Sequence, residues 1–278
     1  MTQHIDMKTE NGFLRTTLGA TGMDVCRVGF SASYFPGKAT VRYAVEQGIN
    51  YFFGYGFDLQ LVNVLKEEFQ GKREKLILAT GAYNLIWGYP NLRRTLEKRL
   101  RQFRTDYIDV FMFLGVMKEK QMPPVVLEEL RKFKEEGKVR AIGLSCHDRK
   151  LVGRLSAQGA MDVMMMRYNA AHRGAEKDIF PYLPPHNPGI VSYTATRWTR
   201  LLRRPKDWPK DGLIPTAGMC YRFVLTNPHV HVCLTAPTNK RQLEENLAAL
   251  HQGPLNEEEL FFMRQFGDAV YAHQKWFM

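Results

Sequence analysis

The chain alternates between short apolar runs and longer segments in which apolar residues recur every three or four positions. The short runs are apolar along most of their length and rich in β-branched and aromatic residues, which is typical of parallel strands covered on both faces. They predict eight strands, at residues 27–30, 49–53, 76–80, 108–113, 141–145, 163–166, 190–194 and 231–235. The periodic segments predict helices that bury one stripe each, at residues 40–46, 59–69, 91–103, 125–136, 149–157, 175–182, 217–226 and 240–250.

Eight strand–helix units in 278 residues predict the α/β class and, within it, a closed (β/α)₈ TIM barrel. A doubly wound open sheet is the alternative, but no Gly-x-Gly-x-x-Gly follows the first predicted strand. Residues 14–25, with Gly19-Ala20-Thr21-Gly22 at their centre, predict an N-terminal β-hairpin ahead of the barrel. Residues 257–274 predict a last helix packed outside it. No linker or low-complexity stretch divides the chain, so residues 1–278 are expected to form a single domain.

Composition narrows the class of protein. A hydrophobic content of 45% is enough for one sizeable core. No apolar run is long enough to span a bilayer, and the polar start MTQHIDMKTENG lacks the apolar stretch of a signal peptide. The four cysteines are scattered without a CxxC pair, which favours reduced thiols in a cytoplasmic protein. The eight histidines lack ligand spacing, so we expect no metal site.

The net charge of +11 raises the question of a nucleic-acid partner. The lysines and arginines are spread over the predicted helices, where solvated outer faces are the simpler interpretation. We therefore expect neither a nucleic-acid nor a membrane partner, and the sequence leaves the oligomeric state open. A positive field would still attract a phosphate-bearing cofactor or an anionic small-molecule substrate.

Several segments, in the expected order, resemble the aldo-keto reductase superfamily. TTLGATGMDVCRVGF resembles its N-terminal hairpin and first strand, AVEQGINYFF its second strand and TDYIDVFMF its fourth. GKVRAIGLS, DVMMMRYN and YRFVLTNP resemble later elements, and QLEENLAAL closes a match that runs from Leu14 to about Leu250. The chain is identified as a divergent member. The resemblance implies a barrel that binds NADP(H) and reduces carbonyl groups.

The family's catalytic tetrad is Asp, Tyr, Lys and His, and the resemblance implies that all four are replaced here. Phe53 stands at the Asp position, Gly81 at the Lys position and Leu114 at the His position. An ungapped register puts Asp58 at the Tyr position, whereas a shortened loop would put Tyr55 there. The usual mechanism therefore cannot run, and Phe53 and Leu114 are expected to form an apolar floor for a substrate.

Other polar residues at the predicted strand tips are candidates for different chemistry. Asp58, Tyr55 or His172 could donate a proton, although His172 could equally cap a helix. Arg167 and Arg197, the latter beside Trp198, could hold an anionic group of the substrate. The alternative for the two arginines is a structural ion pair with an acid such as Asp162 or Glu176.

The resemblance also implies cofactor contacts. Near the nicotinamide carboxamide, Ser145 and Asn169 match polar positions, whereas Met165 replaces the family's Gln and Thr194 replaces its stacking aromatic residue. The adenine and 2′-phosphate end is better kept, with matches at Thr238, Lys240, Gln242, Glu245 and Asn246. These could instead be ordinary exposed helix residues. Two functions stay open: an NADP(H)-binding oxidoreductase with an atypical mechanism, or a non-redox or non-catalytic relative that binds a small ligand or a protein partner.

Overall fold

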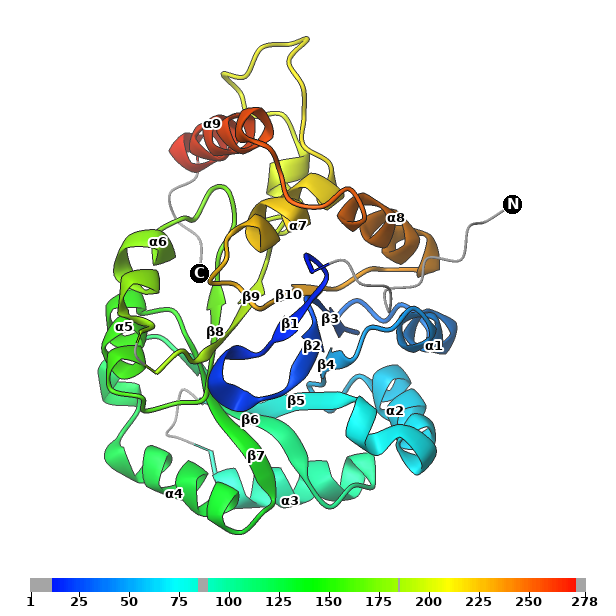
Figure 1. Cartoon of the computed structure of the whole chain (residues 1–278), viewed down its shortest axis with the longest axis vertical. Helices are drawn as coiled ribbons and strands as arrows, with labels where there is room; N and C mark the ends of the chain where they lie inside the picture. Colours follow the sequence, from blue (N-terminus) through cyan, green and yellow to red (C-terminus); the bar gives the residue numbers. More distant parts are fainter. Residues whose placement is uncertain (1–11, 85–89, 185, 274–278) are drawn as a thin grey trace.

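Eight parallel strands close into a barrel in the order β10-β3-β4-β5-β6-β7-β8-β9 (Figure 1). The computed structural model describes residues 12–84, 90–184 and 186–273. Each predicted strand overlaps one strand of the barrel, which confirms the (β/α)₈ fold. The strands are β3 (Val28–Ser31), β4 (Tyr51–Phe53), β5 (Ile77–Tyr83), β6 (Ile108–Val116), β7 (Val139–Cys146), β8 (Val163–Arg167), β9 (Gly189–Tyr193) and β10 (Val232–Thr235).

Helices cover the outside of the barrel and are α1 (Lys38–Glu46), α2 (Leu59–Lys72), α3 (Leu92–Phe103), α4 (Pro124–Glu135), α5 (Arg149–Ala157), α6 (Ala175–Asp178), α7 (Ala217–Thr226), α8 (Lys240–Leu250) and α9 (Glu257–His273). The prediction of one helix over 175–182 was wrong. Ile179, with φ −129° and ψ −57°, leaves helical geometry, and Pro181 has no backbone N–H to continue the α-helical hydrogen bonds, so a separate 3₁₀ helix η4 (Phe180–Tyr182) follows α6. All four cysteines are buried, unpaired thiols. In the described ranges, no helix is long and apolar enough to cross a membrane.

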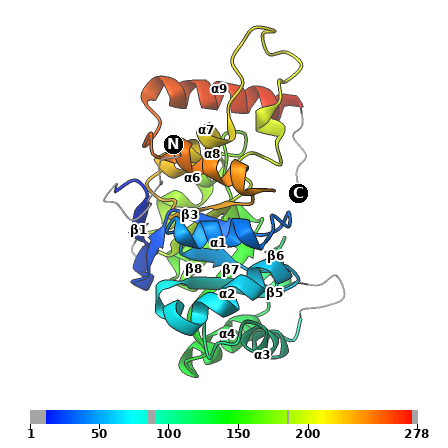
Figure 2. The same ribbon diagram turned by 90° about the vertical axis from the view of Figure 1, so that its right-hand side faces the viewer.

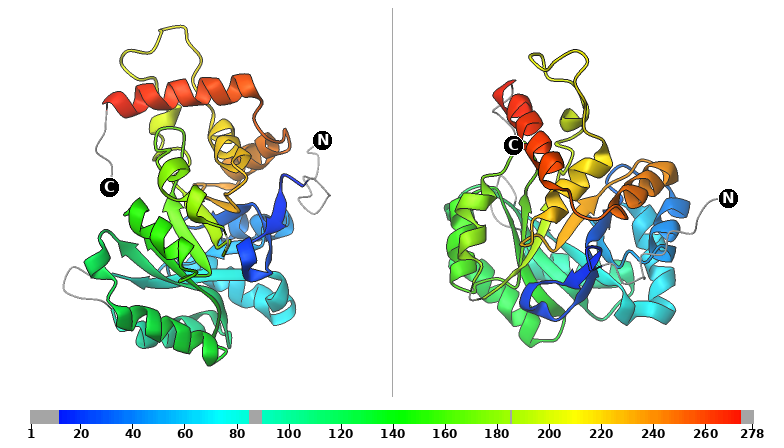
Figure 3. Two further views of the ribbon diagram at one scale, coloured as in Figure 1. Left: turned by 60° about the vertical axis from the view of Figure 1, so that its left-hand side comes forward. Right: turned by 45° about the horizontal axis from the view of Figure 1, so that its top comes forward.

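The predicted N-terminal hairpin is present and closes one end of the barrel (Figures 1 and 3). Strand β1 (Arg15–Thr17) pairs antiparallel with β2 (Asp24–Cys26). Its side chains Leu18, Met23 and Val25 are buried in the same cluster as the residues inside the barrel. The turn packs so tightly that a Cβ atom on Gly19 would lie 2.4 Å from the carbonyl oxygen of Asn187. Its φ of +53° also favours glycine.

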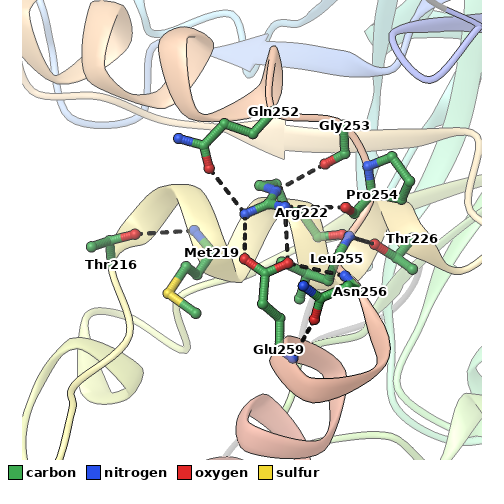
Figure 4. Close-up of polar contacts among 10 residues, drawn as sticks. All are labelled: Thr216, Met219, Arg222, Thr226, Gln252, Gly253, Pro254, Leu255, Asn256 and Glu259. Atoms are coloured by element: carbon green, nitrogen blue, oxygen red, sulfur yellow. Dashed lines mark hydrogen bonds and ion pairs between the residues drawn. The ribbon is translucent and has the colours of Figure 1, made fainter.

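The C-terminal helix α9 packs outside the barrel near α7 and is seen at the top of Figure 2. Its predicted range is confirmed up to His273, and residue 274 lies outside the described residues. Arg222 of α7 joins α7 to the α8–α9 connection and to the first turn of α9 (Figure 4). The buried guanidinium donates to the carbonyl oxygens of Gly253 and Pro254, at 2.8 and 3.1 Å. It also pairs with both carboxylate oxygens of Glu259, at 2.9 and 3.0 Å.

The pH dependence of stability should reflect buried histidines. Burial, and then the charge of Arg27, lower the pKa of His231 to about 4, and its Nδ1 accepts the backbone N–H of Ile190 at 3.0 Å. The folded state therefore binds this proton less readily than the unfolded chain. We expect the free energy of unfolding to fall as the pH is lowered from about 6.5 to about 4. In urea denaturation at several pH values, His231→Asn should flatten this decline and exposed His251→Asn should not; an equal slope in both variants would contradict the assignment.

Candidate functional site

The inside of the barrel is filled by apolar side chains that alternate along the strands. Phe53 of β4 and Leu114 of β6 belong to this interior cluster and are 0% and 2% exposed. Both lie toward the carboxyl ends of their strands, the end at which TIM barrels place their functional loops. Tyr55 and Tyr193 pack on the cluster from the loop side and are partly exposed. These residues define the barrel mouth, with Phe53 and Leu114 as its apolar floor.

Gly81 of β5, which the sequence resemblance matched to the family's lysine, leaves no room for a side chain. A Cβ atom there would lie 2.1 Å from the carbonyl oxygen of Met112 and 2.9 Å from its carbonyl carbon. Both contacts are with the backbone of β6, the neighbouring strand, which pairs Met112 with Gly81. The close approach of β5 and β6 therefore requires glycine.

An aromatic wall follows β4 and β5 at one side of the mouth. The ring of Tyr55 meets Phe53 edge to face at 4.9 Å between centroids. It stacks on Phe57 at 5.2 Å and on Tyr83 at 6.2 Å. Phe57 is 61% exposed, so this wall presents planar apolar surface to solvent. It is suited to a ligand with a flat, apolar part.

Asp58 lies just beyond this wall, but its carboxylate is directed at its own loop. It accepts the backbone N–H groups of Gly56 at 2.8 Å and Tyr55 at 3.4 Å. Burial raises the pKa of Asp58, and these hydrogen bonds oppose the rise. The carboxyl group thus shapes the turn before α2. Of the two residues proposed for the family's Tyr position, Tyr55 is the one whose side chain lies at the mouth.

A polar wall follows β7, β8 and β9 at another side of the mouth. Tyr193 ends β9 beside Arg167, its partner on β8, and its hydroxyl lies 3.4 Å from Nε2 of His147. Burial raises the pKa of Tyr193 to about 12, while the charge of Arg167 and a hydrogen bond with Ser145 oppose the rise. Burial, together with the charge of Arg167, lowers the pKa of His147. The wall thus combines one guanidinium with a neutral phenol and a neutral imidazole.

The sequence analysis did not assign His147 or Tyr193 to the site. It matched the family's stacking aromatic position to Thr194, next to Tyr193, whereas Val191 and Tyr193 are the positions of β9 that contact the interior. Thr194 has a φ of +59° and lies beyond the end of β9, so the strand's alternation of inward and outward side chains ends at Tyr193. The period-two pattern of β9 could have identified Tyr193.

Arg197 and Trp198 lie in a turn at the edge of this wall. Arg197 is fully buried, and its Nη1 donates to the carbonyl oxygen of Val270 in α9 at 2.9 Å. This structural contact takes up part of the guanidinium that was expected to bind substrate. Trp198 is 52% exposed. Arg197, Trp198 and Thr199 all have φ between +50° and +65°, which costs conformational energy outside glycine.

His172 lies near the same edge, with its ring 5.5 Å from that of Tyr271 in α9. Burial, followed by the charges of Arg167 and Arg197, lowers the pKa of His172 to about 4. The imidazole is therefore neutral at pH 7. A neutral imidazole is a poor proton donor, so His172 is suited to accepting a hydrogen bond rather than to acid catalysis.

Of the two residues assigned to the nicotinamide end of the cofactor, Asn169 already uses its side chain within the fold. Ser145 is buried beside Tyr193, at the mouth. Asn169 uses its side chain within the fold, donating to the carbonyl oxygen of Thr194 at 2.9 Å and accepting the N–H of Ala171 at 3.1 Å. Asn169 therefore orders the loop after β8 in this structure.

The residues assigned to the adenine and phosphate end gather at the start of α8. Asn239 caps the helix, and the exposed residues Thr238, Lys240 and Gln242 surround the cap. Lys240 lies 3.6 Å from Glu244, and its ammonium lies 4.4 Å above the ring of Tyr43. An exposed lysine at a helix start suits a phosphate group.

The other two residues of that set differ in exposure. Glu245 is exposed and lies 3.6 Å from Arg241. Asn246 is buried and donates to the hydroxyl of Thr235, at 3.2 Å. The structure thus brings the phosphate-end residues together and keeps Asn246 in the packing beneath them. Among the described residues, no three His, Cys, Asp or Glu side chains are arranged to hold a metal ion.

Together, a closed parallel barrel and a mouth built on the loops after its strands define a TIM barrel. The chain belongs to the aldo/keto reductase family, whose model matches residues 37–266. This confirms the family resemblance drawn from the sequence.

Similar proteins support this assignment. The oxidoreductase YqkF of Bacillus subtilis is 23% identical over 87% of this chain and 93% of its own length. L-galactose dehydrogenase of Arabidopsis thaliana is 25% identical over 84% of this chain and 86% of its own length. The fold is similar to that of the holo form of aldo-keto reductase AKR11C1 from Bacillus halodurans, with a TM-score of 0.76, 20% identity and coverage of 92% and 96% of the two chains.

Proposed function

We propose that this protein is an oxidoreductase of the aldo/keto reductase family that binds NADP(H) and acts on a small molecule with a planar apolar part and an anionic group. The observation that carries this proposal is the pairing of two unlike walls at one mouth. Tyr55 and Phe57 offer apolar ring surface, whereas Arg167 offers a partly buried positive charge. A ligand that combines both properties would satisfy both walls.

The proposed reaction does not use the family's tetrad. Gly81 supplies no cation, so a proton donor needs another partner. Tyr193 has the cation Arg167 beside it and the imidazole of His147 within 3.4 Å. The positive charge favours the phenolate that proton donation would leave behind. Tyr193 therefore joins Tyr55 as a proton donor that the mouth can present to a carbonyl oxygen.

The cofactor proposal rests on the start of α8, where Lys240 and the exposed helix terminus fit a phosphate group. NADP(H) would supply or accept a hydride when bound. In this chain, Lys240 would hold the phosphate end, and Ser145 and Tyr193 would position the other end at the mouth. Met165 offers no hydrogen bond there, so affinity is expected to come mostly from the phosphate end.

A non-redox relative that binds a small ligand is the second candidate, and a specific observation favours it. Burial shifts the pKa of Tyr193 upward to about 12 and the pKa values of His147 and His172 downward. All three groups are thus held in their neutral forms. Such a mouth is suited to binding a ligand, and its phenol and imidazole groups are poorly suited to donating a proton at neutral pH.

Nucleotide titration separates the two candidates. NADPH and NADP⁺ are titrated by fluorescence and calorimetry into the unmodified protein, Lys240→Ala and Lys132→Ala. If the proposal holds, Lys240→Ala weakens binding about tenfold, since a charge-assisted contact contributes about 1.5 kcal/mol. Lys132→Ala, at an exposed position of α4, should bind like the unmodified protein. Failure of the unmodified protein to bind either nucleotide would leave only the non-redox candidate.

A further inference from the structure

A basic cavity lies outside the barrel mouth, between the segment that follows β9 and the last turns of α9. Its volume is about 420 Å³, within the range of small-molecule sites. It is lined by Arg200, Arg203, Arg204, Pro205, Lys206, Val270 and His273, and we call it the rim pocket. Three arginines and one lysine, all exposed, thus line one pocket that is open to solvent. At its edge, His273 pairs with Asp207 at 2.9 Å.

Aromatic packing holds the walls of the rim pocket in place. The segment after the 3₁₀ helix η5 (Arg200–Leu202) projects beyond α9 (Figure 2). Trp208 fastens it, because its ring meets Phe266 of α9 at 4.9 Å and its Nε1 donates to the carbonyl oxygen of Leu213 at 2.9 Å. Arg204 donates to the carbonyl oxygen of Gly212 at 3.1 Å. Because these contacts already order the residues around the pocket, less conformational entropy is lost when a ligand binds.

The rim pocket shares a wall with the barrel mouth. Val270 lines the pocket, and its carbonyl oxygen accepts the hydrogen bond from Arg197. The neighbouring residue, Tyr271, contacts His172 at the mouth. The two spaces are therefore adjacent, but their side chains differ: the pocket is cationic, and the mouth is largely aromatic and neutral.

We propose that the rim pocket binds a small molecule through one or two phosphate groups, as a site separate from the mouth and from the start of α8. Guanidinium groups form paired hydrogen bonds with phosphate oxygens, and those of Arg200 and Arg203 line this pocket. Arg204 adds positive charge, although its Nη1 already donates to its own loop. Pro205 and Val270 give the rest of such a ligand an apolar surface. A nucleic acid would instead need basic groups spread along a track.

Inorganic pyrophosphate is the probe for this site, and calorimetry in low salt is the measurement. To remove the α8 site, all proteins carry Lys240→Ala. The double variant Arg203→Ser/Lys206→Ser is expected to bind pyrophosphate at least tenfold more weakly than this parent. The control Arg94→Ser/Lys98→Ser makes the same charge change at exposed positions of α3 and should bind like the parent.

Three results would overturn the proposal. One is no binding by the parent, and another is equal weakening in both double variants, which would indicate a general charge effect. The third is a single-stranded oligonucleotide that binds far more tightly than pyrophosphate and loses this affinity in Arg203→Ser/Lys206→Ser, which would make the pocket part of a nucleic-acid surface. NADPH does not enter this test, so its outcome is independent of the proposed cofactor.

Discussion

Replacing Gly81 by alanine should destabilise the protein by about 3 kcal/mol, because the new Cβ atom would overlap the backbone of Met112. The nearest atom, at 2.1 Å, is a main-chain oxygen, so β5 or β6 must move. Gly71→Ala is the matched control. Gly71 lies exposed in α2 with nothing within 4 Å of an added Cβ, and alanine there should stabilise by about 0.5–1 kcal/mol. Urea denaturation of both variants measures the difference.

The same clash bears on catalysis. Restoring the family's residues singly, by Phe53→Asp, Asp58→Tyr, Gly81→Lys or Leu114→His, should add no oxidation of NADPH by common aldehydes beyond that of the unmodified protein, because each group acts through the others. We expect the four together to fail as well, since a lysine at residue 81 separates the strands that must hold it. A Gly81→Lys variant as stable as the unmodified protein would show that the strands have room, and would refute this account.

Loss of the Arg222 side chain is the second large effect. Arg222→Met should destabilise by about 2–3 kcal/mol, because it removes the buried guanidinium that donates to two backbone carbonyls and to half-buried Glu259. Arg222→Lys should recover little, since one ammonium cannot reproduce a planar fork of donors. Lys72→Met breaks an exposed ion pair with Glu68 and should cost about 0.5 kcal/mol or less.

The midpoint of urea denaturation, together with its slope, checks this second prediction. An Arg222→Met protein that unfolds at the same urea concentration as Lys72→Met would mean that α9 is held by apolar packing alone. The slope should stay unchanged if the whole domain still unfolds in one step.

The barrel could be predicted from the sequence because its strands and helices have different periods of apolar residues, and each period is a local property. All eight strands were located in this way. The prediction of one helix over 175–182 was wrong because Pro181 has no backbone N–H to continue the helical hydrogen bonds, and this outweighed the periodicity. Burial could be inferred for Phe53 and Leu114 because their neighbours along the chain are apolar as well.

The site was less predictable because it depends on contacts between distant residues. Arg197 meets Val270, which is 73 residues further along the chain, and only the folded structure reveals that this arginine is anchored to α9. The orientation of the Asp58 carboxylate depends on the conformation of the short turn before it, which the sequence does not determine. The rim pocket likewise joins residues near 203 to residues near 270.

Within the residues that the structure describes, the hairpin closes the lower end of the barrel and leaves the mouth as the way into its interior. Leu18, Met23 and Val25 block the far end, and the hydroxyl of Tyr51 is buried without a hydrogen-bond partner among the described residues. A ligand that approaches Phe53 therefore enters through the mouth, and the water that it displaces leaves through the same opening. Exchange at such a dead end depends on how far the loops around the mouth open, so bulkier ligands should enter and leave more slowly whatever their affinity.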